Sequence, residues 1–181
     1  MSKHPVFRHV IAFLLAFVFP LVAVFVWWGG FREVEITSGT AGPYTYAYME
    51  QRGDYSKLPD LASTVAGHLT MQNIPAGLPI TVLYSNPDVV DVGQRLGRTG
   101  FLLPPGVRVK YPLLQDSLPA RSVVIARIQA GSLLAPSKAY AALDHYQQAR
   151  GQGIRMPTVE LYRAPDTPTQ MGVLTVEMPN P

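Results

Sequence analysis

Hydrophobic and polar positions divide the chain into an apolar N-terminal run and a longer part with mixed periodicity. Residues 10–28, VIAFLLAFVFPLVAVFVWW, contain no charged side chain and no amide. At a rise of 1.5 Å per residue, about twenty such residues cross a hydrocarbon core of roughly 30 Å. Trp27 and Trp28 end the run, where indole rings favour the headgroup layer. The run predicts a transmembrane anchor at 10–28, between a cytoplasmic stub at 1–9 and a linker at 29–33.

Two other interpretations of this run are open. A buried core helix would carry a polar stripe, which the run lacks. A signal peptide has a shorter apolar region and a small-residue cleavage site, which WWGGF does not provide. Lys3 and Arg8 precede the run, whereas Arg32 alone follows closely, so the positive-inside rule favours an exported domain. We therefore expect a single-pass membrane protein whose partner through residues 10–28 is the lipid bilayer.

The remainder, residues 34–181, predicts one α+β domain that contains an internal repeat. Five identities recur at an offset of 78 residues, and the blocks LPITVLYSNPD (78–88) and MPTVELYRAPD (156–166) match best. Repeat one covers about 44–103 and repeat two about 122–178. Each reads as an alternating strand, a glycine turn, a helix with proline in its first turn, and two further strands. The pattern predicts antiparallel sheets with two helices.

The expected boundaries follow the apolar periodicity and the turn residues. Helices are expected from about residue 58 to 73 and from about 136 to 151. Strands are expected at 44–51, 80–84, 96–103, 122–129, 158–162 and 172–178, with an edge strand at 33–37. The proline-rich stretch 104–118 reads as a connection between the repeats.

Charge alters this interpretation little. The chain has 15 Lys and Arg against 12 Asp and Glu, but Lys3, Arg8 and Arg32 flank the apolar run. The domain is thus formally neutral, and the pI of about 9.3 does not indicate nucleic-acid binding. The chain has no cysteine, which excludes disulfides and thiolate metal sites. His68 and His145 lack carboxylates at ligand spacing, so no metal and no cofactor are expected.

One acidic residue interrupts an apolar strand. Alternation over 158–162 places Thr158, Glu160 and Tyr162 on one face and Val159 and Leu161 on the other. The offset of 78 gives Glu160 the place of Val82. An exposed sheet face would explain this acid. Alternatively, Glu160 lies at the floor of a pocket between Tyr84 and Tyr162, where it attracts a cationic ligand or acts as a general base with a raised pKa.

The first strand carries a row of tyrosines. Tyr44, Tyr46, Tyr48 and Glu50 alternate and share one face. Such stripes serve core packing or the recognition of flat, cationic molecules. No phosphate-binding loop, dinucleotide fingerprint or hydrolase signature is present. The candidate ligand-binding residues are therefore Glu160, Tyr162, Tyr84, Tyr48 and Tyr46, and Glu160 is the candidate catalytic base if the site is hydrolytic.

Several short motifs resemble a known family. G-D-Y at 53–55, L-Y-S-N-P at 83–87, A-L-D-H-Y at 142–146 and V-E-L-Y at 159–162 resemble the GyrI-like domain, the effector-binding module of multidrug-sensing regulators. SOUL haem-binding proteins share its architecture. The resemblance covers about 34–178 and implies two strand–helix–strand–strand units around a central groove. It also implies that Glu160 meets cationic aromatic ligands, or activates water as a glutamate does in hydrolytic relatives.

A second resemblance concerns the membrane run and the domain together. V-E-I-T-S-G at 34–39 and N-P-D-V-V at 86–90 are similar to the testis-expressed ER-phagy receptor family, which places one membrane helix before a GyrI-like domain. The chain ends at Pro181 without the long tail of those receptors. This favours a bacterial homologue, in the inner membrane with its domain in the periplasm.

Three functions follow in order of preference. The first is a membrane-tethered domain that binds a small amphipathic or cationic aromatic molecule. The second is a non-catalytic adaptor for an unknown protein partner. The third is a hydrolase of reactive small molecules that uses Glu160 as general base, so an enzyme is the less favoured class. No helix-turn-helix precedes the domain, so nucleic acid is not an expected partner.

Overall fold

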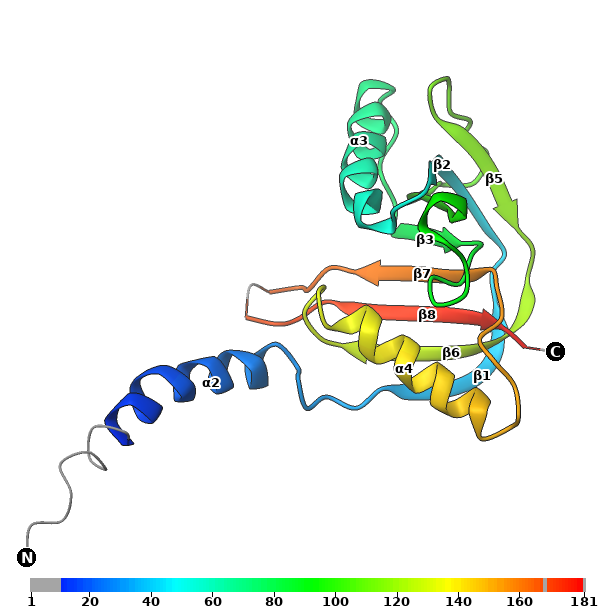
Figure 1. Ribbon diagram of the computed structural model, residues 1–181. Helices are drawn as coiled ribbons and strands as arrows, with labels where there is room; N and C mark the ends of the chain where they lie inside the picture. Colours follow the sequence, from blue (N-terminus) through cyan, green and yellow to red (C-terminus); the bar gives the residue numbers. More distant parts are fainter. Residues whose placement is uncertain (1–10, 168, 181) are drawn as a thin grey trace, which may run out of the picture.

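The computed structural model describes residues 11–167 and 169–180, and a single antiparallel sheet of eight strands lies at its centre (Figure 1). The order across the sheet is β1-β6-β8-β7-β3-β4-β2-β5. The expected α+β class and antiparallel pairing are confirmed. The strands are β1 Glu35–Ala41, β2 Tyr44–Arg52, β3 Pro79–Leu83, β4 Leu96–Leu102, β5 Leu114–Leu118, β6 Arg121–Gln129, β7 Thr158–Arg163 and β8 Val173–Pro179.

Two helices pack on the same face of this sheet, which we call the helical face. They are α3, Leu58–Met71, and α4, Ala135–Gln148. Each has a proline in its first turn, where the missing backbone N–H would have no helical partner. α3 packs mainly against β2 and β4, and α4 packs mainly against β6 and β8. The central strands β3 and β7 therefore lie between the two helices rather than under either one.

The internal repeat is real, but its offset is 77 rather than 78 residues. Matching elements have equal lengths: β2 and β6 have nine residues, α3 and α4 fourteen, and β4 and β8 seven. Their first residues are 77 apart, as in Leu58 and Ala135. The strand order also reads the same from either edge once each strand is exchanged for its counterpart. The two halves are thus related by an approximate two-fold axis between β3 and β7.

The register between β3 and β7 places this axis. Val82 pairs with Val159, and Thr81 pairs with Glu160. Since Val82 and Val159 are 77 residues apart, the counterpart of Glu160 is Leu83, and the predicted equivalence of Glu160 with Val82 is wrong. A slip of one residue along a strand moves a side chain to the other face of the sheet. Gapless matching of the two blocks had therefore paired residues of opposite faces.

The two edge strands are exchanged between the halves. β1 precedes the first repeat but pairs with β6 of the second, and β5 precedes the second repeat but pairs with β2 of the first. β5 lies within the stretch expected to be a connection, 104–118. Its residues, LQDSL, are mostly exposed, so the strand has neither an apolar run nor a buried alternation to indicate it. Its pairing with β2 is what makes it a strand.

The apolar N-terminal run does not form the expected membrane anchor. It contains a π-helical stretch, Leu14–Val18, followed by the nine-residue α2, Phe19–Trp27. Over the described residues, 11–167 and 169–180, no helix has the length and apolarity needed to cross a bilayer. α2 rises only about 14 Å, against a core of roughly 30 Å. The predictions of a transmembrane helix, a bilayer partner and a periplasmic location are therefore wrong. The predicted stub at 1–9 lies outside the described residues.

Candidate functional site

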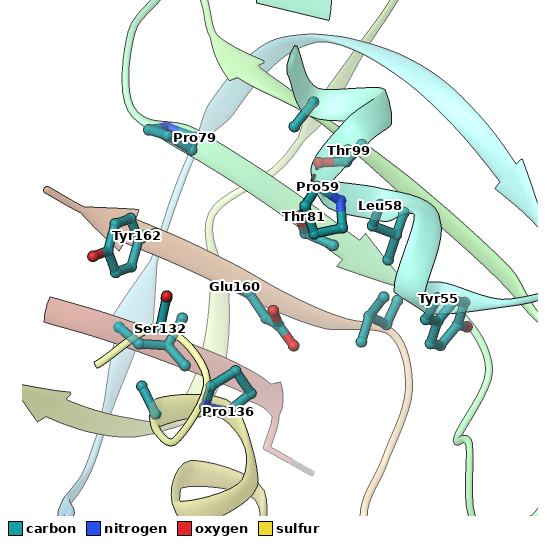
Figure 2. Close-up of a pocket in the computed structure, with 14 residues that line it drawn as sticks. Tyr55, Leu58, Pro59, Pro79, Thr81, Thr99, Ser132, Pro136, Glu160 and Tyr162 are labelled. Carbon is teal, nitrogen blue, oxygen red and sulfur yellow. Dashed lines mark hydrogen bonds between the residues drawn. The ribbon is translucent and has the colours of Figure 1, made fainter. Parts of the chain in front are cut away.

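A groove of about 430 Å³ lies on the helical face between the two helices, above β3 and β7 (Figure 2). Its position follows from the packing, because each helix covers two strands of its own half and leaves the middle of the sheet open. The volume is within the range of ordinary small-molecule sites. It is lined by Tyr55, Leu58, Pro59, Ala62, Pro79, Thr81, Leu83, Thr99, Ser132, Ala135, Pro136, Glu160, Tyr162 and Leu174. We call it the central groove.

Pairs related by the approximate two-fold axis face each other across the central groove. Pro59 of α3 has its counterpart in Pro136 of α4, and both line the groove. The strand pair is Leu83 of β3 and Glu160 of β7. The groove is therefore nearly symmetric in shape but not in charge, since one half presents a leucine where the other presents a carboxyl group.

A short chain of hydrogen bonds holds Glu160. The Tyr140 hydroxyl on α4 donates to Oε1 of Glu160 at 2.8 Å. The same hydroxyl lies 2.8 Å from Oγ1 of Thr158. Because the single Tyr140 proton is given to Glu160, the Thr158 hydroxyl is the donor to Tyr140. Within the described residues, Oε2 of Glu160 accepts no hydrogen bond, so one carboxyl oxygen is left for a bound molecule.

Burial raises the pKa of Glu160 above its ordinary value, and the hydrogen bond from Tyr140 opposes this rise only in part. Burial also raises the pKa of Tyr140, with the adjacent Glu160 charge as the second cause. Tyr140 therefore stays protonated and remains a donor when Glu160 ionises. Both helices present their N-terminal turns to the central groove, and the positive end of a helix dipole favours a negative charge there. No Lys, Arg or His is among the lining residues.

Tyr162 forms the end of the central groove away from Tyr55. Its hydroxyl packs against Gly172, where an added Cβ would overlap the hydroxyl. At the other end, the Tyr55 hydroxyl is engaged with the carbonyls of Ser85 and Leu96 at 3.0 and 2.8 Å. Tyr55 therefore offers a ring rather than a hydroxyl. The groove has aromatic walls at both ends and one carboxyl group near its middle.

Of the predicted site residues, the structure brings together only Glu160 and Tyr162. The predicted alternation in β7 is confirmed, because Thr158, Glu160 and Tyr162 share the helical face while Val159 and Leu161 join the core of the opposite face. Tyr84, Tyr48 and Tyr46 also lie on that opposite face.

The three tyrosines surround Arg98. Its guanidinium lies 4.5 Å from the centre of the Tyr48 ring and 5.0 Å from that of Tyr84. The Arg98 group also donates to Tyr84 Oη at 3.0 Å and to Asp116 Oδ2 at 2.7 Å. The cation that these tyrosines meet is therefore one of the protein's own side chains.

A second buried acid provides a comparison. Glu177 of β8 is 3% exposed and lies on the opposite face. Both of its oxygens are used: Oε1 accepts from the Tyr44 hydroxyl at 2.6 Å, and Oε2 accepts from Arg121 at 2.8 Å. Glu177 is fully satisfied within the fold, whereas Glu160 keeps one oxygen free towards a cavity. Only Glu160 has the arrangement of a ligand-binding acid.

Sequence reasoning missed Tyr140 and Thr158. Thr158 was placed on the correct face but given no role. Tyr140 is one turn after Pro136 on α4, and spacing of four residues puts both on one side of a helix. The apolar stripe of α4, which includes Ala139 and Leu143, drew attention away from this neighbouring stripe. Within the part of the chain that the structure describes, no three His, Cys, Asp or Glu residues gather as metal ligands.

Comparison with known proteins supports the fold. No family model and no curated protein matches the chain by sequence. The C-terminal domain of EcmrR is similar, with a TM-score of 0.61 and 13% identity over 81% of this chain and 96% of that chain. SAV2435 bound to tetraphenylphosphonium has a TM-score of 0.55 and 12% identity over 80% of this chain and 93% of that chain. A hydrolase encoded by lin2189 from Listeria innocua has a TM-score of 0.51 and 12% identity, over 81% and 91%.

Identities this low establish the fold alone. The likeness supports the GyrI-like fold that the sequence motifs indicated. None of these comparisons shows a relation to the ER-phagy receptor family.

Proposed function

We propose that the central groove binds a small amphipathic molecule with an aromatic body and a positive charge, and that Glu160 meets the charge. The observation that carries this proposal is the free Oε2 of Glu160 in a groove whose lining residues include no cationic side chain. A buried carboxylate without a partner is costly. A bound cation removes that cost, and the aromatic walls contribute apolar contact and cation–π attraction.

The raised pKa of Glu160 gives this proposal a pH signature. A permanently cationic ligand favours the ionised carboxylate, so affinity falls as the pH drops through the pKa of Glu160 in the free protein. Ligand binding in turn lowers that pKa by the same coupling. A neutral aromatic ligand of the same shape would show no such pH dependence.

The test is isothermal titration with tetraphenylphosphonium, the cation bound by the structurally similar SAV2435. We expect Glu160→Gln to weaken binding about 10- to 100-fold, which corresponds to roughly 1.4–2.8 kcal/mol. Tyr162→Leu should also weaken binding, because it removes an aromatic wall. Tyr84→Leu is the matched control, since Tyr84 lies on the other face of the sheet. Equal binding by wild type and Glu160→Gln, or equal losses in the two tyrosine variants, would contradict the assignment.

A second candidate function is hydrolysis with Glu160 as general base. The raised pKa and the free Oε2 are what a base near neutral pH requires, provided that a water molecule lies within hydrogen-bond reach. Under this candidate, turnover of an electrophilic substrate is abolished in Glu160→Gln. Tyr140→Phe shifts the pH–rate profile to higher pH, because the hydrogen bond that lowers the Glu160 pKa is lost. Binding without turnover across a panel of strained electrophiles leaves the binding function alone.

A further inference from the structure

A second cavity adjoins the central groove at Glu160. It has a volume of about 480 Å³ and lies between the start of α4 and the loop after β3. Three residues line both cavities: Leu83, Pro136 and Glu160. The remaining lining residues are Asn86, Pro87, Asp88, Ser137, Tyr140, Ala141, Asp144 and Ile154. We call it the tail cavity. Glu160 therefore stands between two spaces rather than at the end of one.

The two cavities differ in character. Apart from Glu160, the central groove contains only hydroxyl groups among many apolar carbons. The tail cavity adds the amide of Asn86 and the carboxylates of Asp88 and Asp144. Asp144 is half-buried, and its Oδ2 accepts from Gln148 at 2.6 Å. The lining residues of the tail cavity include no Lys, Arg or His. Its acceptors thus suit a molecule that brings hydrogen-bond donors or a second positive charge.

We propose that the ligand is elongated, with its aromatic head in the central groove, its first positive charge beside Glu160, and a polar cationic tail in the tail cavity. This inference rests on the proposed function of the central groove and extends it to a substrate class. A compact cation would fill one side of Glu160 and leave the other to water. A chain that passes Glu160 uses both cavities, with Leu83 and Pro136 contacting its apolar middle.

Three probes separate head and tail. Tetraphenylphosphonium is compact, hexyltriphenylphosphonium adds an uncharged chain, and its analogue with a terminal trimethylammonium group adds charge at the end of the same chain. We expect the bis-cation to bind about three- to tenfold more tightly than the hexyl compound, as a partly exposed charge pair allows. Raising the ionic strength should reduce this preference.

Two variants locate the tail. Ala141→Phe fills the tail cavity from an exposed position on α4, and should weaken the bis-cation about tenfold while tetraphenylphosphonium changes less than twofold. Asp144→Asn should remove most of the preference for the terminal charge. Asp60→Asn on α3 is its matched control, because Asp60 is an exposed acid that lines neither cavity. The thermal midpoint of each variant checks that it folds.

The outcomes distinguish this inference from the function on which it rests. If tetraphenylphosphonium binds through Glu160 but the bis-cation gains nothing over the hexyl compound, the tail cavity is not part of the site. The same conclusion follows if Ala141→Phe weakens all three probes equally, or if Asp144→Asn and Asp60→Asn behave alike. If none of the probes binds, both the central groove and the tail cavity are wrongly assigned.

Discussion

Replacing Tyr140 by phenylalanine tests the hydrogen-bond chain at the centre of the site. The substitution keeps the ring and removes one hydroxyl, which donates to Glu160 at 2.8 Å and accepts from Thr158 at the same distance. Both partners are on β7, whereas Tyr140 is on α4. The variant should therefore lose free energy of unfolding by an amount that depends on the charge of Glu160.

The size of the loss follows from the two bonds. At a pH where Glu160 is protonated, the variant loses interactions between neutral groups, worth about 0.5–1.5 kcal/mol each. At a pH where Glu160 is ionised, one lost bond is to a carboxylate, worth roughly 1.5–3 kcal/mol, and no other described residue donates to that oxygen. The pKa of Tyr140 is raised, so its hydroxyl remains a donor throughout. The destabilisation should therefore grow as the pH rises through the pKa of Glu160.

Urea denaturation of wild type and Tyr140→Phe at a series of values from about pH 4 to pH 9 measures this change. Above the Glu160 pKa, a loss of about 2 kcal/mol corresponds to a thermal midpoint lower by roughly 4–8 °C. The Glu160→Gln background completes a double-mutant cycle, and there the loss should be small and independent of pH. A loss that is the same at all pH values, or the same in both backgrounds, would refute the proposed chain.

Three further predictions concern stability alone. Glu160→Gln should stabilise the protein at neutral pH, because the raised pKa of Glu160 makes its ionisation cost stability as the pH rises from 4.5 through the folded-state pKa; below about pH 4 the gain should vanish, and a constant gain would contradict the burial argument. Tyr46→Phe should raise the free energy of unfolding by about 1 kcal/mol, because the buried Tyr46 hydroxyl has no hydrogen-bond partner among the described residues; a clear loss of stability in urea titration would count against it. Gly100→Ala should cost more than about 3 kcal/mol, since its Cβ would overlap the backbone of β2, whereas Gly93→Ala has open space around it and should change stability little; similar midpoints for the two variants would contradict this.

Local pattern was sufficient for most of the sheet and for both helices. Apolar alternation, glycine turns and first-turn prolines predicted seven of the eight strands and both long helices, α3 and α4, to within a few residues. These signals work because the burial of each element is decided by its own residues. β5 carried no such signal, since its exposed residues form a strand only through pairing with β2.

The site was harder to predict because it depends on register and on contacts between elements. Glu160 stood out as an acid in an apolar strand, and it does line the groove. Tyr84 was paired with Tyr162 by an offset one residue too long, and this error moved it across the sheet. Tyr140 becomes a partner of Glu160 only after α4 packs on β6 and β8, a long-range contact that helical periodicity does not contain. The apolar run at 10–28 was misjudged because hydropathy was counted without the division of its helix.

The exchange of edge strands has a consequence for the origin of the groove's single charge. The same exchange in a symmetric dimer of separate half-chains would hold two identical halves together, and positions 83 and 160 would then carry the same residue. Two glutamates would face one groove, and ionisation of one would oppose ionisation of the other. Fusion of the halves into one gene removes that restriction, because each half then mutates independently. Leu83 and Glu160 are such a divergence, and they give a bound molecule one orientation instead of two equivalent ones.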